Sequence, residues 1–249
     1  MTYKTPNKIL NPNHRVTIGV YGIGGTGSHV LTSLIGLDKS LKALGHPGIH
    51  VKAYDFDKVT QSNIGRQKFY PQDIEKSKAE ILIKRINAIY GLDWKSYSED
   101  SYKENIIVTC FDNVASRRKA KEEIVKRLIG YGQNSFERIH YWIDSGNSEN
   151  DGQVIIGSYD KNGRSVLPDI SSVTNDFKDM DDNPNEPSCS LAEALQHQDL
   201  MVNKFAADIT INFIWKIFRY GKLEFRGAYF NLDKIKVIPI PIIPIKTVN

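Results

Sequence analysis

The chain has 249 residues, of which 40% are hydrophobic, and its 33 basic and 29 acidic residues leave a formal net charge of +4. This length and apolar content are enough for one sizeable buried core. The near balance of charge argues against nucleic-acid binding, which calls for a clustered basic face. The sequence contains neither a long apolar run nor a secretory signal, so we expect a cytoplasmic protein without a membrane segment.

The first half of the chain alternates short apolar runs with amphipathic segments. Strands are predicted at 16–21, 49–56, 106–111 and 140–143, and helices at 28–37, 76–90 and 115–129. Strands that are apolar along their whole length and alternate with helices indicate a parallel sheet covered on both faces. We therefore predict an α/β fold of Rossmann-like type, with a mostly parallel sheet and helices on both faces.

The second half changes character after a long polar segment. Residues 160–188 are rich in Asp, Asn, Pro and Ser, and a loop of that length is usually functional or disordered. A long amphipathic helix follows from 202 to 217, and two alternating segments meet at 231–233. We predict a single domain over 1–249. It has a nucleotide-binding half at 15–158, a crossover loop at 159–189, and a helix with antiparallel strands at 190–249 that extends the sheet.

A glycine cluster follows the first predicted strand and opens the first helix. Its members are Gly22, Gly24, Gly25 and Gly27. Glycines at a G-x-G-x-x-G spacing permit a tight turn and the close approach of a phosphate to the backbone. The N–H groups and the positive end of the helix dipole then hold the anion. In this context the motif favours a nucleotide phosphate site over a purely structural turn.

Two carboxylates, Asp55 and Asp57, end the second predicted strand. A carboxylate at this place can accept hydrogen bonds from ribose hydroxyls. Asp55 lies farther from the glycines than the roughly 20 residues usual in a dinucleotide-dependent dehydrogenase. An acidic turn without a ligand is the alternative interpretation of this pair.

A second group of polar residues follows Asp57 and the next strands. It comprises Asn63, Arg66, Gln67, Lys78 and Asp112. A guanidinium and an ammonium can neutralise the charge on a triphosphate, and a carboxylate is a suitable ligand for Mg²⁺. All five lie at or just past the carboxyl ends of predicted parallel strands, so we expect one site. An NAD-dependent oxidoreductase would not need such a cluster.

These motifs occur in one order: G-x-G-G-x-G, D-x-D, N-x-x-R-Q, Lys78 and C-x-D-N. The series resembles the ThiF/MoeB/HesA superfamily, to which the ubiquitin-activating enzymes belong. The resemblance is strong over residues 15–158 and loose beyond them. Within the superfamily, residues 187–193 and 198–200 resemble the ThiF-related proteins of the PRTRC plasmid cassette.

The resemblance implies an ATP- and Mg²⁺-dependent adenylyltransferase. Its substrate would be the C-terminal carboxylate of a ubiquitin-like or sulfur-carrier-like β-grasp protein, and a conjugating enzyme could follow. Asp55 would bind the ribose, Asp57 would support the metal or the loop, and Asp112 would hold Mg²⁺. The phosphates would be contacted by Asn63, Arg66, Gln67 and Lys78. A homodimer is implied, and structural zinc is not expected because the zinc-binding cysteine pairs of many relatives are absent.

Several alternatives stay open at this point. Lys76 competes with Lys78 for the phosphate contact. Cys110 is predicted to be a small core residue, whereas Cys189 lies just before a helix, where the helix dipole lowers a thiol's pKa. We hypothesise that Cys189 accepts the activated protein as a thioester; a packing role is the alternative. The other candidate functions are adenylation of a small or RNA-borne carboxylate, NAD-dependent oxidation, and a non-catalytic nucleotide-binding scaffold.

Overall fold

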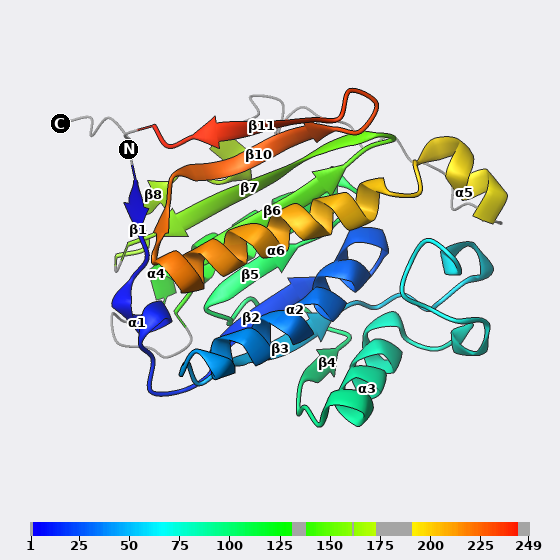
Figure 1. Cartoon of the computed structure of the whole chain (residues 1–249), viewed down its shortest axis with the longest axis horizontal. Helices are drawn as coiled ribbons and strands as arrows, with labels where there is room; N and C mark the ends of the chain where they lie inside the picture. Colours follow the sequence, from blue (N-terminus) through cyan, green and yellow to red (C-terminus); the bar gives the residue numbers. More distant parts are fainter. Residues whose placement is uncertain (1, 131–137, 161, 173–190, 244–249) are drawn as a thin grey trace.

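The computed structural model describes residues 2–130, 138–160, 162–172 and 191–243. Its centre is a nine-stranded sheet in the order β11-β10-β7-β6-β5-β2-β3-β4, with β8 paired to β7 (Figure 1). The strands are β2 (Val16–Tyr21), β3 (Ile49–Tyr54), β4 (Lys95–Tyr97), β5 (Ile106–Thr109), β6 (Tyr141–Asn147), β7 (Asp151–Tyr159), β8 (Ser165–Leu167), β10 (Phe225–Asn231) and β11 (Lys236–Pro241). A separate pair joins β1 (Tyr3–Lys4) to β9 (Lys222–Leu223).

The sheet combines a parallel and an antiparallel part. Strands β4, β3, β2, β5 and β6 are parallel neighbours, whereas β7, β10 and β11 continue the sheet in antiparallel pairing. The predicted fold class is therefore confirmed, including the antiparallel extension by strands of the C-terminal half. Within the described residues, strands from both halves of the chain share this sheet.

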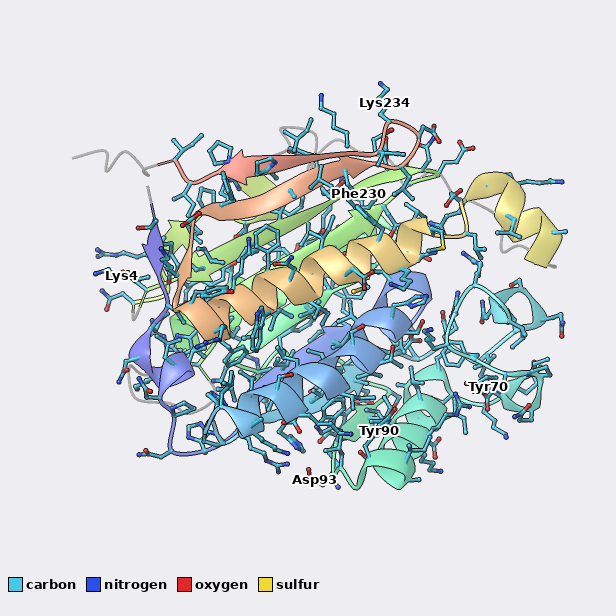
Figure 2. All side chains as sticks on the ribbon, in the orientation of Figure 1. Lys4, Tyr70, Tyr90, Asp93, Phe230 and Lys234 are labelled. Atoms are coloured by element: carbon cyan, nitrogen blue, oxygen red, sulfur yellow. The ribbon has the colours of Figure 1, made fainter. Side chains whose placement is uncertain are left out.

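Helices cover both faces of the sheet. On one face, α2 (Gly25–Ala43), α3 (Lys78–Tyr90) and α6 (Val202–Tyr220) contribute to one hydrophobic cluster, and α2 packs along α6 (Figure 1). On the other face, α4 (Val114–Gly130) buries Ala120 and Ile124 against a second cluster. Phe230 of β10 packs against the first turns of α6 (Figure 2). No helix in the described part of the chain is long and apolar enough to cross a membrane.

The short elements connect these layers. They are α1 (Asn7–Leu10), α5 (Leu191–His197) and the 3₁₀ turns η1 (Gln61–Asn63), η2 (Pro71–Asp73) and η3 (Ile170–Ser172). The residues before β2 form β1 and α1, and Ile9 of α1 is buried in the core and anchors them. Part of the predicted crossover loop forms β8 and η3, and residues 173–190 lie outside the described range.

Helix boundaries follow local capping. The Ser77 hydroxyl accepts a hydrogen bond from the Glu80 N–H, so α3 begins at Lys78, within the range predicted to be helical. Gly91, in the left-handed conformation with φ 64°, ends the same helix. The first long helix begins earlier than predicted, with Gly24 as its N-cap, so its first turn lies inside the glycine cluster.

A buried acid joins the carboxyl ends of β2 and β3. The rings of Tyr21 and Tyr54 are stacked with centroids 4.3 Å apart, and Tyr102 stacks on the other side of Tyr21 at 4.4 Å. Both strand-end hydroxyls donate to Glu104, at 2.7 and 2.8 Å, and Glu104 is fully buried. Lys52 Nζ lies 3.1 Å from the same carboxylate and balances its charge. This cluster fixes the two strand ends from which the site is built.

Replacing Glu104 by alanine is expected to lower the free energy of unfolding by about 3 kcal/mol, because two tyrosine hydroxyls and one ammonium lose their partner in the interior. Urea denaturation monitored by circular dichroism measures this quantity. Glu99→Ala, at an exposed position of the loop between β4 and β5, is the matched control and should leave the midpoint nearly unchanged. Equal midpoints for the two variants would contradict a stabilising role for the buried cluster.

Candidate active site

Three of the predicted site residues lie at the carboxyl edge of the parallel strands. The chain passes from β2 to β3 and β4 on one side, and then returns to β5 and β6 on the other. Strand order reverses beside β2, and ligands of α/β sheets bind in the crevice that such a reversal creates. Gly22 and Asp55 follow directly on β2 and β3, and Asp112 lies just beyond β5.

The glycine cluster is shaped by close contacts. Gly22 has φ 83°, in the left-handed region that favours glycine. A Cβ added at Gly27 would lie 1.8 Å from the Gly22 carbonyl oxygen, and one at Gly25 would lie 2.3 Å from Asn203 Oδ1. A Cβ added at Gly24 would meet nothing within 4 Å. Three glycines thus allow the turn and the helix packing, whereas Gly24 borders open space at the start of α2.

Asp55 anchors this loop. One carboxylate oxygen accepts the Ile23 N–H at 2.5 Å, and the other accepts the Asp57 N–H at 2.7 Å. Burial raises the pKa of Asp55, while the Lys78 charge and the two N–H donors oppose that shift. The carboxylate therefore ties the end of β3 to the glycine turn after β2. This role was not predicted from the sequence; the ribose contact stays a prediction.

The two candidate lysines occupy different environments. Lys78 is buried, and its Nζ lies 2.9 Å from Asp57 Oδ2. Its backbone N–H also donates to the Asp57 carbonyl oxygen, at 3.0 Å. Lys76 is exposed and precedes the helix cap. The geometry therefore places Lys78, with Asp57, close to Asp55 just past the carboxyl end of β3.

The segment 60–67 supplies the remaining polar groups. Asn63 is buried, and its Oδ1 accepts the Thr60 N–H at 3.0 Å, so this side chain caps η1. Gln67 is also buried, and its Oε1 has no hydrogen-bond partner among the described residues. A buried amide oxygen without a partner is costly. Gln67 is thus a candidate acceptor for a donor on a bound ligand.

Arg66 is held at two of its three guanidinium nitrogens. Its Nε donates to the Ser62 carbonyl oxygen at 3.4 Å, and its Nη1 donates to Gln198 Oε1 at 2.8 Å. The third nitrogen, Nη2, makes no hydrogen bond within the described chain. Burial lowers the pKa of Arg66, and the nearby charge of Asp112 opposes that shift. Arg66 remains a cation, and its Nη2 is available to an anion.

The loop that carries Asp112 is fixed by an ion pair that was not predicted from the sequence. Arg117 Nε lies 3.2 Å from the buried Asp144 carboxylate, and its Nη1 donates to the Asn113 carbonyl oxygen at 3.4 Å. Arg117 Nη2 also donates to the Phe111 carbonyl oxygen. Asp144 lies in the middle of β6, opposite Thr109 at the carboxyl end of β5, and directly follows the strand predicted at 140–143, so the strand-end rule that selected Asp112 could also have found it.

The donor set is compatible with Mg²⁺ bound together with a nucleotide. Asp112 is exposed, and one of its oxygens accepts the Asn113 side-chain N–H at 3.0 Å. Within the described ranges no three His, Cys, Asp or Glu side chains form a metal-binding cluster. Mg²⁺ commonly uses one or two carboxylates and takes its other ligands from phosphates and water. Asp112 fits that pattern.

Of the two cysteines, the structure describes Cys110 but not Cys189. Cys110 packs against the hydrophobic core, and burial raises the pKa of its thiol, which suits a core residue rather than a nucleophile. Cys189 lies outside the described residues, so its proposed thioester role stays a prediction.

Gly24→Ala tests whether the open space at the start of α2 receives a phosphate. The variant should fold, because its methyl group meets no neighbour, but its affinity for ATP should fall at least about tenfold as the methyl group occupies the anion's approach. Gly36→Ala, in the exposed middle of the same helix, is the control and should bind ATP like the parent. Calorimetric titration gives both affinities; equal values would rule out this anion site.

Several solved structures have a fold similar to that of this chain. The structure is similar to E. coli MccB with selenomethionyl MccA (TM-score 0.61, 15% identity), covering 98% of this chain and 67% of that one. It is also similar to E. coli MccB with ATP (TM-score 0.59, 16% identity), covering 97% and 66%. PaaA gives a TM-score of 0.60 at 14% identity, covering 92% and 65%. This chain thus spans about two thirds of the length of these proteins.

At these identities the likeness establishes the fold. A comparison with curated proteins found no match. The narrower resemblance to the PRTRC proteins stays a prediction. The sequence model of the ThiF family matches residues 10–248, and the chain belongs to the ThiF family.

Proposed function

We propose that this protein is an ATP-dependent adenylyltransferase that activates the C-terminal carboxylate of a ubiquitin-like protein. The proposal rests chiefly on one observation, which is that four groups suited to binding a nucleotide lie at one edge of the sheet. They are the open space at Gly24, the buried Lys78, Arg66 with one nitrogen not hydrogen-bonded, and the exposed Asp112. Membership of the ThiF family and a similar fold in ATP-bound MccB support an adenylyltransferase type of enzyme that uses ATP.

The proposed reaction is a displacement at the α-phosphorus of ATP. A carboxylate oxygen of the substrate forms a bond to this phosphorus, the bond to the bridging oxygen of the β-phosphate breaks, and pyrophosphate leaves. The product is a mixed anhydride of the substrate and AMP. The protein's contribution is to align the two reactants and to stabilise the charge on the phosphates.

Each site residue has a distinct part in this proposal. The N–H groups at the start of α2 would bind one phosphate, and Arg66 Nη2 and Lys78 Nζ would bind others. Asp57 binds the Lys78 ammonium, which a phosphate would then share. Asp112 would hold Mg²⁺, which neutralises phosphate charge when it is bound. Asn63 shapes the loop, and Gln67 offers its unpaired oxygen.

A shorter peptide is a second candidate substrate. Structures of MccB with MccA, including N-formylated MccA, favour it, because their fold is similar to that of this chain. Both candidates present a C-terminal carboxylate, so the chemistry at the α-phosphorus is the same. A later transfer to Cys189 would require its thiolate to attack the acyl carbon with release of AMP. That step, the homodimer and the conjugating enzyme belong to the proposal.

Pyrophosphate exchange tests the reaction. The protein is incubated with ATP, Mg²⁺, labelled pyrophosphate and each candidate polypeptide, and incorporation of label into ATP is measured. We expect exchange that requires the polypeptide's free C-terminal carboxylate and disappears when that group is amidated. Tight ATP binding without exchange for any polypeptide would contradict the proposed substrate and leave a small-molecule carboxylate or a scaffold function.

Variants of the site residues assign the roles. Asp112→Ala and Lys78→Met should each slow exchange by about 100-fold or more, because each removes charge stabilisation from the phosphates. Lys76→Met is the matched control for the lysine, since Lys76 is exposed and Lys78 is paired with Asp57. Its exchange rate should remain within about twofold of the parent. A larger loss in Lys76→Met than in Lys78→Met would reverse the assignment.

A further inference from the structure

A chain of side-chain hydrogen bonds connects Arg66 with the glycine turn. Gln198 Oε1 accepts from Arg66 Nη1 and from Asn203 Nδ2, both at 2.8 Å. Asn203 Oδ1 in turn accepts from Thr26 Oγ1 at 3.1 Å, and Thr26 Oγ1 lies 2.8 Å from Asn147 Oδ1. These groups come from the segment after η1, the α5–α6 junction, the first turn of α2 and the end of β6.

The Gln198 amide is oriented at both of its polar atoms. While its oxygen accepts two hydrogen bonds, its Nε2 donates to the Ser148 carbonyl oxygen at 3.3 Å. The next residue, Asp199, donates its backbone N–H to the Glu149 carbonyl oxygen at 2.8 Å. Two successive residues therefore attach the α5–α6 junction to the turn between β6 and β7. An acceptor held in this way can fix the direction of a long, flexible arginine side chain.

The Gln198 amide carries no charge, so it leaves the positive charge of Arg66 intact. A carboxylate at this position could also accept from the guanidinium, but it would lose the N–H donor to the Ser148 carbonyl oxygen and would offset the positive charge that a phosphate needs. An amide oxygen can orient the guanidinium without offsetting its charge. Gln198 and the Ser62 carbonyl oxygen together occupy Nη1 and Nε, so among the described residues Nη2 is left without a hydrogen-bond acceptor.

We infer that Gln198 is a positioning residue that holds Arg66 for phosphate binding and joins it, through Asn203 and Thr26, to the glycine turn. The inference rests on the proposed function, since it assumes that Arg66 meets a phosphate of ATP. It adds that the α5–α6 junction, far from the nucleotide motifs in sequence, is part of the ATP site. A Cβ on Gly25 would contact Asn203 Oδ1, so the same network lies against the start of α2.

A double-mutant cycle tests this with the full chain, ATP and Mg²⁺. The variants are Gln198→Met, Arg66→Met and the combination, and the dissociation constant of ATP is measured by calorimetry. Gln198→Met should weaken ATP binding about tenfold when Arg66 is present, and less than about twofold when Arg66 is already methionine. Gln196→Met, an exposed glutamine on α5, is the matched control and should change nothing.

The outcomes separate the inference from the function beneath it. No ATP binding by the parent protein would overturn both. ATP binding by the parent with no change in Gln198→Met, or with an equal loss in both Arg66 backgrounds, would overturn the positioning role alone. A purely structural role would lower the thermal midpoint of Gln198→Met and weaken ATP binding equally in both backgrounds.

Gln198→Glu provides a second test that does not depend on the methionine variants. It keeps an acceptor at the same place but adds a negative charge beside Arg66. ATP binding should weaken by about tenfold or more at low salt, and the difference from the parent should shrink as salt screens the added charge. ATP binding as tight as in the parent would contradict the need for a neutral acceptor.

Discussion

The carboxylate of Asp55 is the group on which the rest of the site depends. It accepts the Ile23 N–H of the glycine turn and the Asp57 N–H of the next segment, and so joins the ends of β2 and β3. The turn is thereby held open at the start of α2, and Asp57 is placed to bind Lys78. Next to these strand ends, the buried Glu104 accepts hydrogen bonds from the Tyr21 and Tyr54 hydroxyls and so links the two strands.

The C-terminal half completes the site rather than merely extending the sheet. Its first long helix, α6, packs along α2, and Asn203 in its first turn reaches the glycine turn and the Thr26 hydroxyl. The same region supplies the acceptor for Arg66. Residues from both halves therefore determine where the cationic groups lie, and a fragment ending after β6 would lack the contacts made by Gln198 and Asn203.

Hydrophobic periodicity and the strand-end rule predicted the parallel strands β2, β3, β5 and β6, the long helices, and the strand-end positions of Asp55, Lys78 and Asp112, but not the parallel strand β4. These signals are local, so a single sequence contains them. The choice between Lys78 and Lys76 depends on where α3 begins. The Ser77 cap sets that position. The network through Gln198 had no such signal, because neutral polar residues as far apart as Thr26 and Asn203 show no pattern until folding brings them together. Strand β7 was missed although Val154, Ile155 and Ile156 form a short apolar run.

Transfer of an oxygen atom from the substrate to AMP tests the central claim most directly. The C-terminal carboxylate of a polypeptide that supports pyrophosphate exchange is labelled with ¹⁸O, the adenylate is formed, and hydroxylamine then releases AMP by attacking the acyl carbon. Attack of the carboxylate on the α-phosphorus predicts one ¹⁸O atom in AMP and none in pyrophosphate, as read by mass spectrometry. Label in inorganic phosphate, with ADP as the nucleotide product, would show attack at the γ-phosphorus and would contradict adenylation.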